Sequence, residues 1–187
     1  MKGNAPKVYL AGPFFNDEQK ELIKSVTRAL EDTGCAVFSP MRDGGICPPD
    51  AGPDQVTETY KANVDNIITA EFVFAILDYK LPDWQALIAI DKTNGETVSP
   101  PLSLPDTGTV FEMGYAIARQ VPVITFSEAE PKRINLMLSE PTEGHVVGVS
   151  NIKSAIGALA YAFATNQDTA IAWNWFNREY KYQGQIQ

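Results

Sequence analysis

The segment from Pro105 to Ala116 places two carboxylates, Asp106 and Glu112, on either side of Gly108. Apolar residues at helical spacing follow Gly108, so the segment predicts a helix. Asp106 is a natural N-cap, and Gly108 would let the backbone approach a ligand closely. Glu112 stands within the apolar run, where a carboxylate without a cation is costly. Two interpretations stay open: a functional pair of carboxylates, or an N-cap and a solvated turn residue.

The composition of the 187-residue chain excludes several classes of function. Hydrophobic residues make up 44%, as in a single soluble domain, and a charge of −8 without a Lys/Arg cluster disfavours binding to nucleic acid or anionic membranes. No run approaches the roughly 18 apolar residues of a membrane span, and a signal-peptide core is lacking. One histidine, His145, and two cysteines disfavour zinc catalysis and a disulfide framework. We therefore expect a cytoplasmic enzyme without a metal or cofactor.

Strand and helix patterns alternate along the chain. Strands are expected at 7–11, 36–39, 72–77 and 121–126, and helices from Asn16 or Asp17 to Gly34, at 56–70, after Gly108 and at 152–164, with a loop at 42–53. The alternation predicts an α/β fold: one Rossmann-like or flavodoxin-like domain over 1–187, with a mostly parallel central sheet and helices on both faces. Residues 79–105 are a long insertion, which we interpret as an active-site flap or an oligomer contact.

In such sheets, ligands bind beyond the carboxyl ends of the strands, near a switch in strand order. The segments after Tyr9, Phe38, Leu77 and Phe126 should therefore line one crevice. The unusual residues of the chain fall in these segments: Phe14, Phe15, Arg42, Asp106 to Glu112, and Asn135 to Met137.

Four separated motifs resemble those of the nucleoside 2-deoxyribosyltransferase family. They are Val8-Tyr9-Leu10-Ala11-Gly12-Pro13-Phe14-Phe15, the helix and strand from Asn63 to Asp78, Asp106-Thr107-Gly108-Thr109-Val110-Phe111-Glu112-Met113-Gly114, and Ile134-Asn135-Leu136-Met137. The C-terminal residues 182–187 are also similar to the tail of that family. The resemblance spans nearly the whole chain, and the third and fourth motifs together are its more specific part.

The resemblance implies a two-step exchange of nucleobases on 2′-deoxynucleosides. Glu112 would be the nucleophile that attacks the anomeric carbon, and Asp106 would protonate the departing base. Tyr9 would hydrogen-bond and orient the nucleophile; its alternative is a strand aromatic in the core. An adjacent anion also stabilises the oxocarbenium character of the transition state.

The remaining site residues follow from the same resemblance. The substrate-binding set comprises Gly12, Phe14, Phe15, Arg42, Asn63, Asp78, Gly108, Asn135 and Met137. Phe14 and Phe15 suit stacking on a flat base, although Phe14 also fits the core. The partners implied are 2′-deoxynucleosides, free nucleobases and further copies of the chain, in a homo-oligomer built of dimers, often a hexamer. Asn135 and Met137 would then complete the active site of a neighbouring subunit.

Two positions depart from the pattern of the family. Asn63 stands where the family usually has an aspartate that contacts the base, and an amide cannot act as an acid. Asp65 is the substitute if the helix register differs. In the loop 41–45, where a glutamine that reads the base is expected, Arg42 could contact a base carbonyl or bind a phosphate.

Two other functions remain under comparison. Arg42 would suit a nucleoside 5′-monophosphate N-glycosidase, which uses water and reads a phosphate. The neutral region around Asn135 and Met137 favours an unphosphorylated nucleoside instead. A non-catalytic nucleotide-binding module of Rossmann-like form would explain the fold but not the pair Asp106 and Glu112.

Overall fold

The computed structural model describes residues 5–44, 47–48, 50–78, 105–129, 134 and 136–165. Within them, five parallel strands form one sheet in the order β2-β1-β3-β4-β5. The strands are β1 (Lys7–Ala11), β2 (Ala36–Phe38), β3 (Phe72–Ile76), β4 (Val123–Ser127) and β5 (Gly144–Val147). This is the flavodoxin-like order, so the predicted α/β fold with a parallel sheet is confirmed. Residues 79–104 of the predicted insertion, and Asn135, lie outside the described residues.

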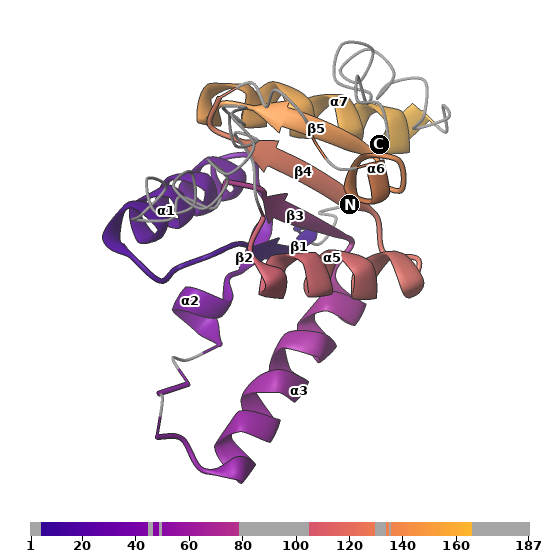
Figure 1. The fold of residues 1–187 in the computed structure, drawn as a ribbon. Helices are drawn as coiled ribbons and strands as arrows, with labels where there is room; N and C mark the ends of the chain where they lie inside the picture. Colours follow the sequence, from indigo (N-terminus) through magenta and orange to yellow (C-terminus); the bar gives the residue numbers. More distant parts are fainter. Residues whose placement is uncertain are drawn as a thin grey trace, which may run out of the picture.

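Helices cover both faces of the sheet (Figure 1). On one face, α1 (Asp17–Glu31) and α7 (Ile152–Thr165) pack over a core that includes Leu10, Phe74 and Phe126. On the other face, α3 (Pro53–Thr69) and α5 (Thr107–Ala118) pack over the alternate residues of the same strands, such as Tyr9. Strand residues alternate between faces, and β3 is buried on both, as its continuous apolar run predicts.

Local capping signals set the ends of α1. The Asn16 side chain accepts a hydrogen bond from the Gln19 backbone N–H, and the Gln19 side chain accepts one from the Asn16 backbone N–H, which forms a capping box. Past the end of the helix, Gly34 adopts a φ of 91°, a left-handed conformation that favours glycine. These two signals bound α1, after which the chain continues into β2, which pairs with β1.

The strand order reverses between β1 and β3, because β2 and β4 lie on opposite sides of that pair. Ligands in open α/β sheets bind at this switch point, beyond the carboxyl ends of the strands. The helix α5 packs against β1, β3 and β4, so the carboxylates of α5 lie over the switch point.

The structure differs from the sequence-based expectation in three elements. Residues Pro40–Asp43 form a short helix, α2, where a loop was expected from Arg42 onward. A fifth strand, β5, and a short helix, α6 (Leu136–Ser139), were not expected. No helix among the described residues is both long and apolar enough to cross a membrane.

Candidate active site

The centre of the candidate site is a hydrogen bond between a strand and a helix far apart in sequence. Tyr9 lies fully buried in β1, and its hydroxyl donates to Oε1 of Glu112 in α5 at 2.5 Å. The ring of Tyr9 stacks on Phe38 of β2 with 5.7 Å between centroids. Tyr9 is therefore both a core aromatic and a donor to the carboxylate, so the two interpretations of this residue are compatible.

The surroundings of Glu112 shift its ionisation toward neutrality. Burial raises the pKa of Glu112 to about 7; the hydrogen bond from Tyr9 opposes this rise, and the charge of Asp106 adds to it. Burial, together with the Glu112 carboxylate, raises the pKa of Tyr9, so the phenol stays protonated and acts as the donor. Glu112 is thus not a solvated turn residue, and a perturbed carboxyl in this position is typical of functional sites.

Asp106 is the N-cap of α5. Its Oδ1 accepts from the Gly108 backbone at 2.8 Å, and its Oδ2 accepts from the Thr109 backbone at 3.0 Å and from the Thr109 hydroxyl. A Cβ atom at Gly108 would lie 3.1 Å from Oδ1, so glycine leaves room for this cap. The capping interpretation of Asp106 is correct, and its influence on Glu112 shows that the two carboxylates also interact.

Asn63 lies on the inner side of α3. Its Oδ1 atom is buried and has no hydrogen-bond partner in the described part of the chain. A Cβ atom at Gly44 would lie 3.1 Å from this oxygen, so the end of α2 approaches the Asn63 amide closely. Asp65, by contrast, is exposed. Asn63 thus has the more buried position of the two, and which of them faces a base stays a prediction.

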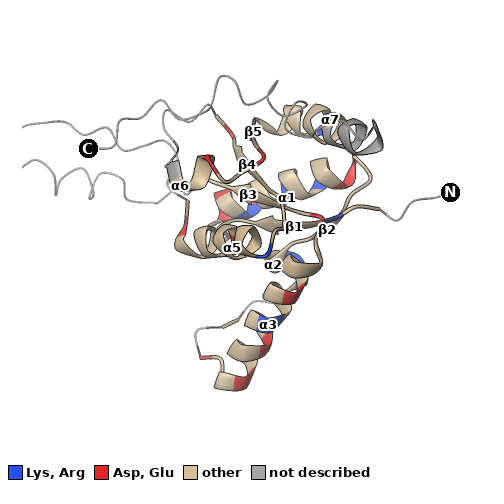
Figure 2. Cartoon of the chain, turned by 90° about the vertical axis from the view of Figure 1, so that its right-hand side faces the viewer, with Lys and Arg blue, Asp and Glu red and all other residues tan. Residues whose placement is uncertain are grey.

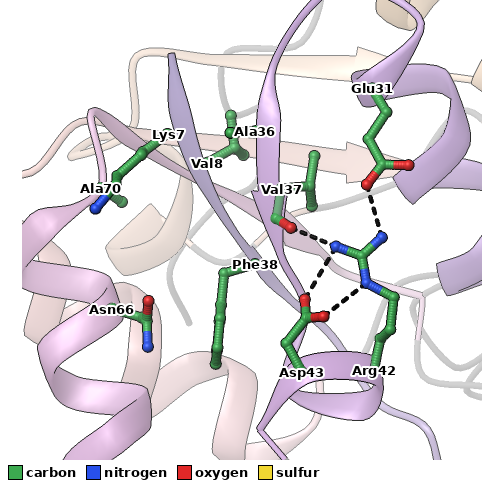
Figure 3. A pocket seen from close by; sticks show the side chains of 10 residues that line it. All are labelled: Lys7, Val8, Glu31, Ala36, Val37, Phe38, Arg42, Asp43, Asn66 and Ala70. Carbon is green, nitrogen blue, oxygen red and sulfur yellow. Dashed lines mark hydrogen bonds and ion pairs between the residues drawn. The ribbon is translucent and has the colours of Figure 1, made fainter. Parts of the chain in front are cut away.

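Arg42 is held by protein groups rather than open to a ligand. Its guanidinium donates to Glu31, to Asp43 and to the carbonyl oxygen of Val37 (Figure 3). It lines a cavity of about 360 Å³ around β2, which neither Tyr9 nor Glu112 lines. These bonds use four of the five N–H donors, so a base carbonyl or a phosphate could reach only the second N–H of Nη1 without displacing a partner.

The loop after β1 divides into core and surface residues. A Cβ atom at Gly12 would lie 3.2 Å from Cβ of Ile76, so glycine permits close packing on β3. Phe14 is half-buried against the core, whereas Phe15 is 67% exposed and stacks on Phe14. Phe15 is therefore the more exposed ring of this pair.

The other predicted residues occupy the ends of the strands and α6. Asp78 follows β3, is buried, and accepts a hydrogen bond from the Glu128 backbone at 2.6 Å. Met137 in α6 is 74% exposed. Asn135 lies outside the described residues, so its predicted role stays a prediction.

Gly44, Thr109 and His145 were not proposed as site residues from the sequence. Gly44 and Thr109 contact Asn63 and Asp106, and a Thr three residues after an N-cap Asp was an available signal for Thr109. His145 is buried in β5 between the hydroxyls of Thr125 and Ser127, at 2.9 and 2.8 Å. Burial lowers the pKa of His145 to about 4, so the imidazole is neutral near pH 7. No group of three potential metal ligands occurs among the described residues.

Comparison with known proteins gives one family and several similar structures. The family model for nucleoside 2-deoxyribosyltransferase matches residues 8–150. The structure of a 2-deoxyribosyltransferase from the psychrotolerant bacterium Bacillus psychrosaccharolyticus is 25% identical, with 79% of this chain and 90% of that chain covered and a TM-score of 0.61. No curated protein sequence matches the chain.

Two further structures are less similar. A conserved protein from Enterococcus faecalis V583 is 15% identical over 80% of this chain and 87% of that chain, with a TM-score of 0.48. A CMP N-glycosidase from Clostridium botulinum is 17% identical over 81% of this chain and 97% of that chain, with a TM-score of 0.47.

Proposed function

The chain belongs to the nucleoside 2-deoxyribosyltransferase family, and from this premise we propose that it transfers the 2-deoxyribosyl group between nucleobases through a covalent intermediate on Glu112. The observation that carries the proposal is the hydrogen bond from the buried Tyr9 to Glu112 at the switch point of the sheet. The substrates are 2′-deoxynucleosides and free nucleobases.

The first step uses the oxygen that Tyr9 leaves open. Tyr9 holds Oε1 of Glu112, so Oε2 attacks the anomeric carbon as the bond to the base breaks. The bonding electrons pass to the base nitrogen, which takes up a proton. In the second step, a ring nitrogen of the incoming base gives its proton to Asp106 and attacks the same carbon, and Glu112 leaves as a carboxylate. The raised pKa of Glu112 makes it more basic than an exposed glutamate, which favours bond formation.

Asp106 is the proposed acid for the departing base, and its capping geometry sets a condition on that role. Its oxygens accept from two backbone N–H groups and one hydroxyl at the start of α5. The two oxygens offer about four acceptor positions and these bonds fill three, so the remaining position on Oδ1 is the one that can carry the proton toward the base.

The preference of the enzyme for deoxyribose follows from the covalent step. A ribose 2′-hydroxyl withdraws electrons from the anomeric centre and would crowd the face that Glu112 approaches. We therefore expect deoxyadenosine to be used much faster than adenosine with the same acceptor base.

The deciding experiment mixes deoxyadenosine with a second base and follows the products by chromatography. A new deoxynucleoside supports the transferase, while free adenine without exchange would indicate the N-glycosidase. Unchanged substrate under all conditions would favour the non-catalytic binding module. A ratio of kcat/KM near one for deoxyadenosine and adenosine would contradict the proposed sugar preference.

A further inference from the structure

We propose that Arg42 is a positioning residue, which fixes the end of α2 against Asn63 and so sets the selectivity for the base without touching the substrate. The inference rests on the proposed transferase and adds to it a source of base selectivity. It assigns to Arg42 a role other than binding a base carbonyl or a phosphate.

Every nitrogen of the Arg42 guanidinium donates within the protein. Nη1 bonds Oε1 of Glu31 at 2.6 Å, Nε bonds Oδ1 of Asp43 at 2.8 Å, and Nη2 bonds Oδ2 of Asp43 at 3.0 Å and the Val37 carbonyl oxygen at 2.5 Å. These partners belong to α1, α2 and β2. Figure 3 shows the guanidinium between Glu31 and Asp43. One planar, forked side chain therefore joins three elements, a geometry that lysine cannot reproduce.

The helix α2 depends on this arrangement. It has four residues, too few for stability in isolation, and the hydroxyl of its N-cap, Ser39, makes no capping bond. Instead, Oδ2 of Asp43 accepts the backbone N–H of Ser39 at 2.9 Å. Arg42 holds that same carboxylate, so it fixes the orientation of the whole turn.

The far end of α2 meets Asn63. At Gly44, a Cβ atom would lie 3.0 Å from the carbonyl oxygen of Pro40 and 3.1 Å from Oδ1 of Asn63, so there is no space for a side chain between them. The buried oxygen of Asn63 has no partner in the described part of the chain. An unpaired buried acceptor is costly until a ligand donates to it, and an exocyclic amino group of a base supplies such a donor.

The charges of the three side chains are complementary near neutral pH. The hydrogen bonds that Arg42 donates to Asp43 and Glu31 raise the pKa of Arg42. Burial alone would raise the pKa of Asp43, but the hydrogen bonds from Arg42 and Ser39 outweigh it and the pKa is lowered. The side chains of Arg42 and Glu31 are each 43% exposed, so the ion pair adds little to stability and acts mainly through geometry.

The test is a double-mutant cycle on kcat/KM for deoxyadenosine and deoxyinosine with one acceptor base. Deoxyinosine carries a carbonyl where deoxyadenosine carries an amino group. Arg42→Ala and Asn63→Ala should each reduce the preference for deoxyadenosine about tenfold, and the double variant no further. Arg28→Ala, which removes an exposed arginine of α1, is the matched control and should leave the preference unchanged.

Two kinetic outcomes would overturn the proposal. One is that Arg42→Ala and Asn63→Ala lower kcat/KM equally for both nucleosides, with effects that add in the double variant. Arg42 would then have only a structural role. A loss confined to deoxynucleoside 5′-monophosphates, relative to the nucleosides, would make it a phosphate ligand. If Arg42→Ala does not fold, Glu31→Gln weakens one partner and should change the preference in the same direction by a smaller factor.

A measurement without substrate separates this inference from the proposed function. The side-chain amide resonances of Asn63 in the free protein should shift in Arg42→Ala and not in Arg28→Ala. Unchanged resonances would contradict the positioning role even in an active enzyme. If the wild-type chain neither exchanges nor hydrolyses deoxynucleosides, the proposed transferase fails, and the resonances still decide whether Arg42 orders Asn63.

Discussion

At the scale of single residues, Glu112 combines two demands that oppose each other. A nucleophile must be ionised, yet burial holds the pKa of Glu112 at about 7, so a substantial fraction is protonated at neutral pH. Tyr9 moderates the conflict, because its hydrogen bond favours the ionised form.

The first prediction concerns the pH dependence of the reaction. The kcat/KM of the wild-type enzyme should rise with pH through about 7 as Glu112 ionises. Tyr9→Phe removes a bond to the ionised form, so this limb should move to higher pH and the plateau should fall about tenfold. Glu112→Ala should lose about a thousandfold or more. A limb that stays in place in Tyr9→Phe would show that another group controls it.

The second prediction concerns the effect of the Glu112 carboxyl on the free energy of unfolding. Its pKa is raised from 4.5 when unfolded to about 7 when folded, so between these values the folded protein binds more protons than the unfolded one. The contribution of Glu112 is therefore fully present below about pH 4.5 and is lost as the pH rises through about 7. The loss should reach about 3 kcal/mol.

Urea unfolding at pH 5 and pH 8 can measure this contribution. Glu112→Gln keeps an acceptor for Tyr9 but cannot ionise, so it should gain stability relative to wild type at pH 8 and less at pH 5. If the two proteins differ in stability by the same amount at both pH values, the pKa of Glu112 in the folded protein is not raised.

At the scale of elements, the start of α5 has both a structural and a proposed chemical role. Asp106 caps the helix, and Asp106→Ala should destabilise the protein by about 1 kcal/mol. Asn is also a good N-cap, so Asp106→Asn should keep most of that stability while losing the proton donor. Its turnover should fall most for donors with poor leaving bases. An equal loss across leaving groups would limit Asp106 to capping.

Gly108→Ala offers a matched variant for the same cap. The new Cβ atom would lie 3.1 Å from Oδ1 of Asp106, so it should disturb the carboxylate without removing it. We expect Gly108→Ala, like Asp106→Ala, to lower the thermal stability of the protein. A variant as stable as wild type would mean that the cap adjusts without cost.

Much of the element pattern could be predicted from the sequence. The strand at Lys7–Ala11 and the capping residue Asn16 were predicted because an apolar run or a side-chain cap is a local signal. The turn at Pro40–Asp43 was not, since Arg42 is held in place by Glu31, which lies eleven residues earlier in another helix. The strand β5 was missed because Gly144 and His145 interrupt its apolar run, although both are buried.

In the candidate site, too, some features could be predicted from the local sequence and others could not. The pattern around Gly108 identified Asp106 and Glu112, whereas the partners of Arg42 depend on the tertiary fold. Tyr60 and Ile67 are apolar residues at helical spacing in α3, yet Ile67 is buried and Tyr60 is 52% exposed. The outer part of α3 extends beyond the sheet (Figure 1), so periodicity finds an apolar face but not what lies against it.

At the scale of the whole molecule, the charge pattern supports small neutral substrates. Lys and Arg occur as isolated positions on separate elements, without a continuous basic face on the described elements (Figure 2). With a net charge of −8, a polyanionic partner would be repelled. Nucleosides and free bases are uncharged, so the negative charge of the protein does not repel them.

The last prediction is that the active site is shared between subunits of a homo-oligomer. Met137 leaves an apolar side chain 74% exposed in the single chain, and the family resemblance assigns it, with Asn135, to a neighbouring pocket. Glu112→Ala mixed with Asn135→Ala should therefore regain activity after subunit exchange, because some mixed interfaces hold one intact site. Each variant mixed with itself is the control. If the subunits mix and no activity returns, each site is built within one chain.

The bond from Arg42 to the Val37 carbonyl has a consequence for the behaviour of the protein in concentrated solution. β2 is the outermost strand on its side of the sheet, and its free carbonyl groups could receive a strand from another molecule. Arg42 occupies one of these acceptors at 2.5 Å and places a charged group along the rim. This arrangement disfavours intermolecular pairing at that edge, so we expect removal of Arg42 to make the protein more prone to aggregate.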